Sequence, residues 1–109
     1  MQNNKVLTLL GFASKAGKLG FGMLQSVECL KKRKAKLIVL ASDVSQKSKK
    51  EILFFTHNKN VNTVTLSGVT METLSTAVGK RCGIISVNDN GFADSICKIL
   101  GGYANDKQI

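Results

Sequence analysis

Several kinds of residue are scarce in this chain of 109 residues. It has no proline, no tryptophan, one histidine, one tyrosine and three cysteines that stand far apart. The histidine and the scattered cysteines lack the paired spacing of a metal site or a disulfide framework, and unpaired cysteines are typical of the reducing cytoplasm. No apolar run approaches the roughly 20 residues of a membrane span. We therefore expect a cytoplasmic protein without metal, cofactor or membrane anchor, whose length fits one domain.

Acidic residues are also scarce, and their distribution is uneven. Residues 1–60 hold twelve basic and three acidic residues, a net charge of +9, whereas residues 61–109 hold four of each and are neutral. A basic cluster on a small domain is the usual electrostatic footprint of a partner for polyanions. The alternative is a solvated lysine surface that serves solubility. Charge alone favours a polyanion as the partner.

The pattern of apolar residues predicts helices that alternate with strands. The amino end has apolar residues at helical spacing followed closely by Lys15 and Lys18, which indicates a first helix and not a signal peptide. A short extended segment follows at 18–21, and apolar runs predict strands at 37–41, 61–66 and 83–87. The remaining helices are expected over about 23–33, from Ser45 or Ser48 to about 58, over 71–78, and from about 91 to 100.

The predicted architecture is an α/β fold. Alternating strands and helices of these lengths build a three-layer α-β-α sandwich with about four strands and five helices. One domain is expected over residues 1–100, with a frayed tail at 101–109. Ser48 and Glu51 have the spacing of a capping box for the third helix, with Ser45 as the other candidate cap.

The polar residues do not form a catalytic constellation. His57 lies late in a predicted helix, and Asp43 and Asp89 each follow a strand without a histidine or cysteine nearby. Neither aspartate has the partner that a nucleophile–base pair or a two-carboxylate site needs, and Asp89 fits a turn residue before a helix. The run GKLGFG at residues 17–22 lacks the spacing and the preceding strand of a phosphate-binding loop. We expect no enzymatic activity.

The start of the second helix is the most distinctive feature. Met23, Val27 and Leu30 form its apolar stripe, while Leu24 and Gln25 project away from that stripe. The free N–H groups and the positive dipole of a helix start suit contacts with phosphates or base edges. Alternatively, Leu24 packs under the loop at residues 67–69.

These residues resemble a known family. The blocks Gly17–Lys18–Leu19 and Gly22–Met23–Leu24–Gln25, the run from Lys34 to Asp43, and the segments Ser67–Gly68 and Thr76–Lys80 are similar to the kink-turn-binding ribosomal-protein family. This family is of the archaeal L-seven-Ae and eukaryotic L-thirty-e type, and the chain resembles its small bacterial homologues over Val6 to about Leu100. The resemblance implies the same α-β-α fold and a monomer that binds a kink-turn or a similar bent internal loop of RNA, including ribosomal RNA.

The resemblance also implies which residues bind RNA. The start of the second helix would read the G·A pairs of the bent loop, the loop before the fourth helix would hold an extruded base, and lysines would contact phosphates. The implied set comprises Lys15, Lys18, Gly22, Leu24, Gln25, Glu28, Lys31, Lys32, Gly68, Val69 and Thr70.

The chain departs from the archaeal motif at three positions. Leu24 replaces an asparagine, Gln25 replaces a glutamate and can still accept through its amide oxygen, and Glu28 replaces a lysine. The departures favour an altered or weaker RNA target in which Gln25 and the lysines carry most of the binding. The rival hypothesis is a protein-interaction scaffold with only general RNA affinity, for which Leu24 would be the apolar contact.

Overall fold

The computed structural model describes residues 2–101, 107 and 108. Residues 2–101 form five helices, as expected: α1 (Gln2–Lys15), α2 (Gly22–Lys31), α3 (Gln46–Lys59), α4 (Met71–Val78) and α5 (Asn90–Ile99). The strands are β1 (Leu19–Phe21), β2 (Leu37–Ala41), β3 (Asn62–Leu66), β4 (Ile84–Val87) and the short β5 (Lys107–Gln108). Each predicted helix and strand is therefore present, with bounds that differ by a few residues.

The five strands form one mixed sheet in the order β1-β4-β2-β3-β5. β4 is antiparallel to both of its neighbours, whereas β2 and β3 are parallel, with Val39 opposite Val64. β5 adds to β3 in the parallel direction. β5 falls in the segment for which a frayed tail was predicted, and the rest of that segment after Gly101 lies outside the described residues.

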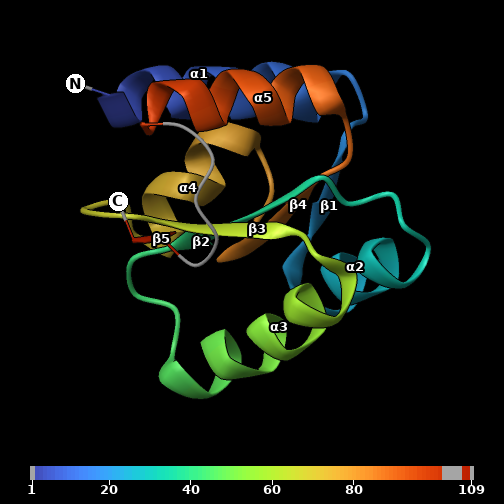
Figure 1. The fold of residues 1–109 in the computed structure, drawn as a ribbon. Coiled ribbons are helices and arrows are strands. Elements are labelled where there is room, and N and C mark those ends of the chain that lie inside the picture. Colours follow the sequence, from blue (N-terminus) through green and yellow to red (C-terminus); the bar gives the residue numbers. More distant parts are fainter. Residues whose placement is uncertain (1, 102–106, 109) are drawn as a thin grey trace.

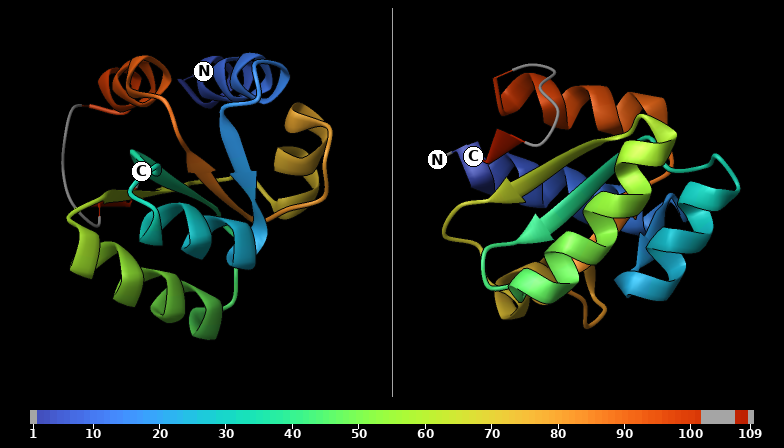
Figure 2. Two further views of the ribbon diagram at one scale, coloured as in Figure 1. Left: turned by 90° about the vertical axis from the view of Figure 1, so that its right-hand side faces the viewer. Right: turned by 60° about the horizontal axis from the view of Figure 1, so that its bottom comes forward.

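Helices cover both faces of the sheet, which confirms the three-layer sandwich. Figures 1 and 2 show α1, α4 and α5 on one face and α2 with α3 on the other. β2 carries side chains into both layers, and all five of its residues are buried. Val39 packs in the larger core under α1, α4 and α5, while Ile38 packs in the smaller core under α2 and α3. This double burial explains the continuous apolar run of β2.

Side chains cap three of the helices. The Thr70 hydroxyl accepts from the Thr73 N–H at the start of α4, as predicted, and Asp89 caps α5. The capping box predicted for α3 is wrong, because Ser45 is the cap and accepts from the N–H of Ser48, which lies inside the helix. The sequence spacing allowed either Ser45 or Ser48 to be the N-cap. Ser45 has the extended backbone that an N-cap residue needs, whereas Ser48 lies within the helix.

The directions of the strands sort the loops onto two edges of the sheet. β1, β2 and β3 all run the same way, so the loops that follow them lie at one edge, together with the loop that enters β4. The loops that enter β2 and β3, and the loop after β4, lie at the opposite edge. In the part of the chain that the structure describes, no helix is long and apolar enough to cross a membrane.

Candidate nucleic-acid interface

The start of α2 has an unusual backbone. Gly22 has a φ of +84°, which strains any other residue. A Cβ added there would meet no atom of the described residues within 4 Å, so the position is open. Phe21 is the N-cap and offers no side-chain oxygen to the helix. Instead, the Gln25 Oε1 accepts a hydrogen bond of 2.8 Å from the Phe21 N–H. The first turn of α2 is therefore held by a side chain that lies within the helix.

The five predicted binding residues that follow Gly22 share one face of α2. Leu24, Gln25, Glu28, Lys31 and Lys32 are all exposed, while Ser26 and Leu30 face the sheet. The Leu24 side chain is 87% exposed, so it does not pack under the loop at residues 67–69, and that alternative is wrong. The predicted apolar stripe is also incomplete, since Ser26 is fully buried between Met23 and Leu30. The sequence did not indicate this burial, because Ser26 is a polar residue.

Two of the lysines on this face have a neighbour, one a carboxylate and the other an aromatic ring. The Lys32 Nζ lies 3.3 Å from a Glu28 carboxylate oxygen, one helical turn away. The Lys31 Nζ lies 5.8 Å from the centre of the Phe55 ring of α3. Such exposed pairs contribute at most about 1 kcal/mol and release their partners easily. Glu28 therefore offsets the charge of Lys32 without locking it in place.

Gly20 allows α2 to lie close to the sheet. A Cβ at Gly20 would stand 2.5 Å from the Ser86 Oγ and 3.0 Å from the Cys29 Sγ. Gly20 is opposite Ser86 in the β1–β4 pair, and Cys29 comes from α2. The glycine thus leaves room for one side chain from the sheet and one from the helix, which sets the height of α2 above β1.

The loop between β3 and α4 contributes backbone more than side chains. Gly68 is exposed and has a φ of +76°, and no atom of the described residues lies within 4 Å of an added Cβ. Val69 is 3% exposed and packs in the larger core, so its side chain cannot contact a base. The Thr70 hydroxyl is held by the Thr73 N–H at 3.2 Å. The surface available for contact is therefore the open backbone around Gly68.

The start of α2 and the Gly68 loop lie at the same edge of the sheet. They follow β1 and β3, which stand three strand spacings apart, or about 14 Å. Lys80 and Arg81, in the loop that enters β4, are exposed between them, and the Lys80 Nζ lies 5.5 Å from the centre of the Phe21 ring. We name Gly22, Leu24, Gln25, Gly68 and Lys80 the loop-edge surface. The binding residues predicted from the sequence did not include Lys80, although Lys80 ends the segment Thr76–Lys80 that resembles the family.

Lys15 and Lys18 are exposed but lie apart from the start of α2. Lys15 borders a groove between α1 and α4 that Gly79 also lines. Lys18 precedes β1, at the opposite end of this strand from Gly22, and its carbonyl accepts from the Asn88 N–H at 2.8 Å. Their predicted phosphate contacts stay a prediction, and Lys18 lies the length of β1 away from Gly22.

The residues weighed for catalysis have structural partners. Asp43 accepts from the Met71 N–H at 2.8 Å, and Asp89 accepts from the Phe92 N–H at 2.9 Å, so each carboxylate caps a helix. Burial raises the pKa of the Cys82 thiol, and burial together with the Asp94 carboxylate raises that of Cys97. Raised pKa values disfavour the reactive thiolate. Among the described residues, no group of three histidine, cysteine or acidic side chains could hold a metal.

The chain is similar in sequence to a known family and to two named proteins. Residues 4–97 match the Ribosomal protein L7Ae/L30e/S12e/Gadd45 family. The chain is 28% identical over 98 residues to RNA-binding protein YlxQ of Enterococcus faecium, covering 90% of this chain and 93% of that protein. It is 32% identical over 87 residues to large ribosomal subunit protein eL30 of Candida glabrata, covering 78% and 82%.

Two solved structures are similar in fold. A protein with unknown function from Bacillus halodurans C superposes with a TM-score of 0.82 and 28% identity, covering 88% of this chain and 96% of that one. The Giardia lamblia 15.5kD RNA binding protein superposes with a TM-score of 0.76 at 15% identity, covering 92% and 85%. The second likeness concerns the fold alone.

Proposed function

Since this chain belongs to the ribosomal protein L7Ae/L30e/S12e/Gadd45 family, we propose that it is a non-enzymatic RNA-binding protein that uses the loop-edge surface. The observation that carries the proposal is the open start of α2, where Leu24 and Gln25 are exposed beside a left-handed Gly22. The net charge of +9 supports a polyanionic partner. Two relatives, named as an RNA-binding protein and as a ribosomal protein, support RNA as that polyanion.

The proposed target is a kink-turn or a related bent internal loop of RNA. Proteins read RNA sequence mainly in irregular loops, because the major groove of the A-form duplex is too narrow for side chains. The loop-edge surface suits such a loop, since its two exposed parts stand about 14 Å apart with Lys80 between them. Gln25 would read a base edge, and the open backbone at Gly68 would accept a base that leaves the stack.

Leu24 changes the chemistry of the contact. It cannot hydrogen-bond a base edge, but an exposed leucine can pack on the face of an unstacked base and remove apolar area from water. Lys80 and Arg81 would contact phosphates, in addition to the lysines already predicted to do so, which are Lys15, Lys18, Lys31 and Lys32. The proposed RNA contact therefore combines one polar reader, one apolar contact and a set of phosphate-binding cations.

We place this activity on the ribosome or on a ribosome-associated RNA, in the cytoplasm, with the protein acting as a monomer. The supporting observations are the ribosomal relative and the three unpaired cysteines at positions 29, 82 and 97. A second candidate function, a protein-interaction scaffold with general RNA affinity, is favoured by one observation, the 87% exposure of Leu24.

A binding titration tests the proposal and separates the two candidates. The protein is titrated against a kink-turn RNA and a duplex of equal length at two salt concentrations. The proposal expects a preference for the kink-turn that persists at the higher salt, because base contacts do not depend on counterion release. Equal and steeply salt-dependent binding to both RNAs would contradict bent-loop recognition and favour the scaffold.

A further inference from the structure

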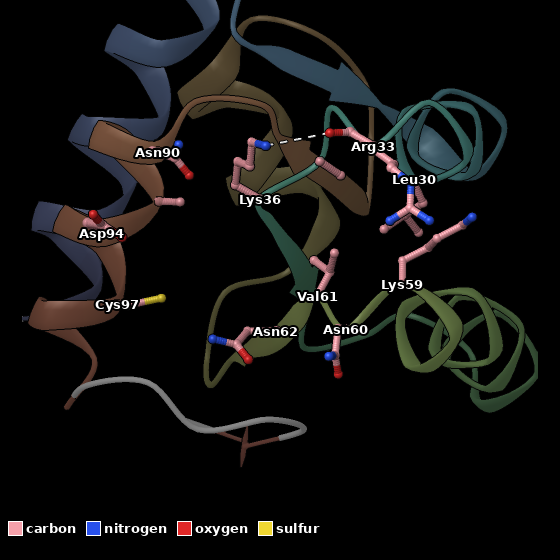
Figure 3. Close-up of a pocket in the computed structure, with 12 residues that line it drawn as sticks. Leu30, Arg33, Lys36, Lys59, Asn60, Val61, Asn62, Asn90, Asp94 and Cys97 are labelled. Carbon is pink, nitrogen blue, oxygen red and sulfur yellow. Dashed lines mark hydrogen bonds between the residues drawn. The ribbon is translucent and has the colours of Figure 1, made fainter.

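A second concave surface lies at the opposite edge of the sheet from the loop-edge surface. Its cavity volume is about 460 Å³, and it sits where the chain enters β2 and β3. Figure 3 shows α5 on one side of this cavity and the ends of α2 and α3 on the other. The volume lies within the range of about 300–1,000 Å³ that small-molecule sites occupy. We call it the entry-edge pocket.

Hydrogen-bond donors dominate the wall of this pocket. Arg33, Lys36 and Lys59 line it from the α2 and α3 side, and the Lys36 Nζ lies 3.5 Å from the Arg33 carbonyl oxygen at its rim. Three asparagines add amide groups, Asn60 and Asn62 from the β3 side and Asn90 from the start of α5. Among the described residues that line the pocket, Asp94 is the one acidic residue, so these residues together carry a net charge of +2.

The backbone at this pocket carries strain. Within the described residues, Arg33 and Asn60 are the two non-glycine residues with positive φ, at 59° and 60°, and both line the pocket. Asparagine tolerates this conformation, whereas a longer side chain without a local hydrogen bond costs about 1–2 kcal/mol in it. Arg33 follows α2, where a glycine would be the relaxed choice. The Arg33 side chain is therefore kept at the wall of the cavity although a glycine would fit its backbone better, which is compatible with a use for its guanidinium there.

From these observations we infer that the entry-edge pocket binds a phosphate group. A planar guanidinium donates two parallel hydrogen bonds to phosphate oxygens, and ammonium groups add charge without a fixed direction. Arg33, Lys36 and Lys59 supply both kinds of cation, and the asparagine amides supply neutral donors around them. A cationic ligand would meet a net repulsive wall.

Two sources can supply this phosphate, the backbone of the bound RNA or a free mononucleotide. α2 runs from the loop-edge surface to the pocket, because Gly22 starts it and Arg33 follows it. Its ten residues span about 15 Å. An RNA strand from the loop-edge surface could therefore follow the exposed face of α2, past Lys32, to the pocket. The RNA source rests on the proposed function, whereas the mononucleotide source does not.

Nuclear magnetic resonance tests the site itself. The labelled protein is titrated with inorganic phosphate and with adenosine monophosphate, and the amide resonances of Asn60, Asn62 and Asn90 are followed. We expect saturable shifts at these amides, which the double variant Arg33→Gly/Lys59→Gln loses. Lys34→Gln is the matched control, because Lys34 belongs to the same exposed basic loop but does not line the pocket. This control should keep the shifts.

Folding is checked by thermal melting. Arg33→Gly places a glycine where the backbone is left-handed, so the double variant should melt no lower than the wild type. Lost shifts in a folded variant are then lost contacts. Absence of saturable shifts in the wild type, or shifts that persist in the double variant, would overturn the phosphate site.

RNA binding by the same variants identifies the source. If the RNA backbone fills the pocket, the double variant should reduce the slope of log affinity against log salt by about 2, since about one unit is lost per phosphate contact. An unchanged slope in the double variant, together with mononucleotide shifts that the wild type shows and the double variant loses, would assign the pocket to a free nucleotide. If the wild type binds no RNA but shows the shifts, the proposed function fails while the phosphate site stands.

Discussion

Gln25 illustrates how one side chain can serve both the helix and a ligand. The Phe21 N–H can only donate, so the atom 2.8 Å from it must be the amide oxygen, and the amide orientation is defined. That oxygen has a second lone pair, and the side chain is exposed. The hydrogen bond to Phe21 therefore restricts the rotamers of the Gln25 side chain before RNA binds and leaves an acceptor at the surface. This lowers the entropy cost of binding.

The first prediction compares two substitutions of Gln25. Gln25→Ala removes the acceptor, so we expect about five-fold weaker binding to a kink-turn RNA, corresponding to about 1 kcal/mol for one hydrogen bond. Gln25→Glu keeps an oxygen for the Phe21 N–H and for the base, so it should retain the preference for kink-turn over duplex. Titrations against both RNAs measure this. A Glu variant as poor as the Ala variant would assign base reading to the amide nitrogen.

The second prediction concerns the exposed leucine on α2. Leu24→Ala should leave the melting temperature unchanged, because the side chain is 87% exposed, and should weaken RNA binding by about 1 kcal/mol through lost apolar contact. Phe54→Ala is the matched control, since Phe54 is 64% exposed but lies on α3. Equal RNA affinities of the two variants would take Leu24 out of the interface.

At the scale of elements, α2 is positioned by its contact with β1 and β4. Gly20, Ser86 and Cys29 meet where the helix crosses these strands, and the Asn88 Nδ2 lies 3.4 Å from the Cys29 Sγ. The Ser86 Oγ is buried and has no hydrogen-bond partner among the residues that the structure describes. This junction sets where the start of α2 stands relative to the loops at the same edge.

The third prediction tests this junction. Gly20→Ala should destabilise the fold by about 1–3 kcal/mol, because the added Cβ would stand 2.5 Å from the Ser86 Oγ. Ser86→Ala alone should be near neutral, since it removes an unpaired buried hydroxyl. The double variant should recover part of the loss, since the clashing oxygen is gone. Denaturant unfolding of all four proteins gives the coupling energy, and strictly additive losses would rule out this contact as the cause.

Across the whole molecule, charge gathers on the layer of α2 and α3 and on the loops beside it. Residues 1–60 have a net charge of +9, and the basic residues between Lys31 and Lys59 belong to these two helices and to the chain around them. Such a field attracts any polyanion and depends strongly on salt. The charge of a residue therefore does not tell whether it contacts RNA or only attracts it from a distance. The location of each lysine and arginine in the structure must distinguish the two.

The fourth prediction compares two pairs of cations. Lys80→Gln/Arg81→Gln should lower the salt slope of kink-turn binding by about 2, because both residues lie on the loop that enters β4, near the start of α2. Lys18→Gln/Lys32→Gln should lower it less, since Lys32 is paired with Glu28 and Lys18 lies at the far end of β1. Equal changes would indicate a diffuse interface spread over both pairs.

The fifth prediction concerns the dependence of stability on pH. Burial raises the pKa of Cys82 above its ordinary value of 9.0, and burial with the Asp94 carboxylate does the same for Cys97. The folded state then binds protons that the unfolded state releases, so the free energy of unfolding should fall as the pH rises above about 9. Cys82→Ala/Cys97→Ala should flatten this fall. Urea unfolding between pH 8 and 10.5 measures it, and equal slopes would contradict the linkage.

The order of elements and most of the core could be predicted from sequence because both follow from local periodicity. The apolar run of β2, the stripe Val6, Leu10 and Ala13 of α1, and the glycine stops at Gly17 and Gly79 each depend on a few neighbouring residues. Ser26 and β5 escaped prediction, since a buried serine and a two-residue strand have no local pattern.

The sequence by itself determined the three-layer fold, the basic half of the chain and the exposed face of α2, because helical spacing and charge are properties of neighbouring residues. Only the tertiary structure decided which loops share an edge of the sheet. It placed Lys80 beside Phe21, moved Lys18 to the far end of β1, buried Val69, and brought Arg33 and Lys59 to the wall of one pocket. These placements involve residues far apart in the chain. They depend on the order and direction of the strands, which cannot be read from the spacing of neighbouring residues.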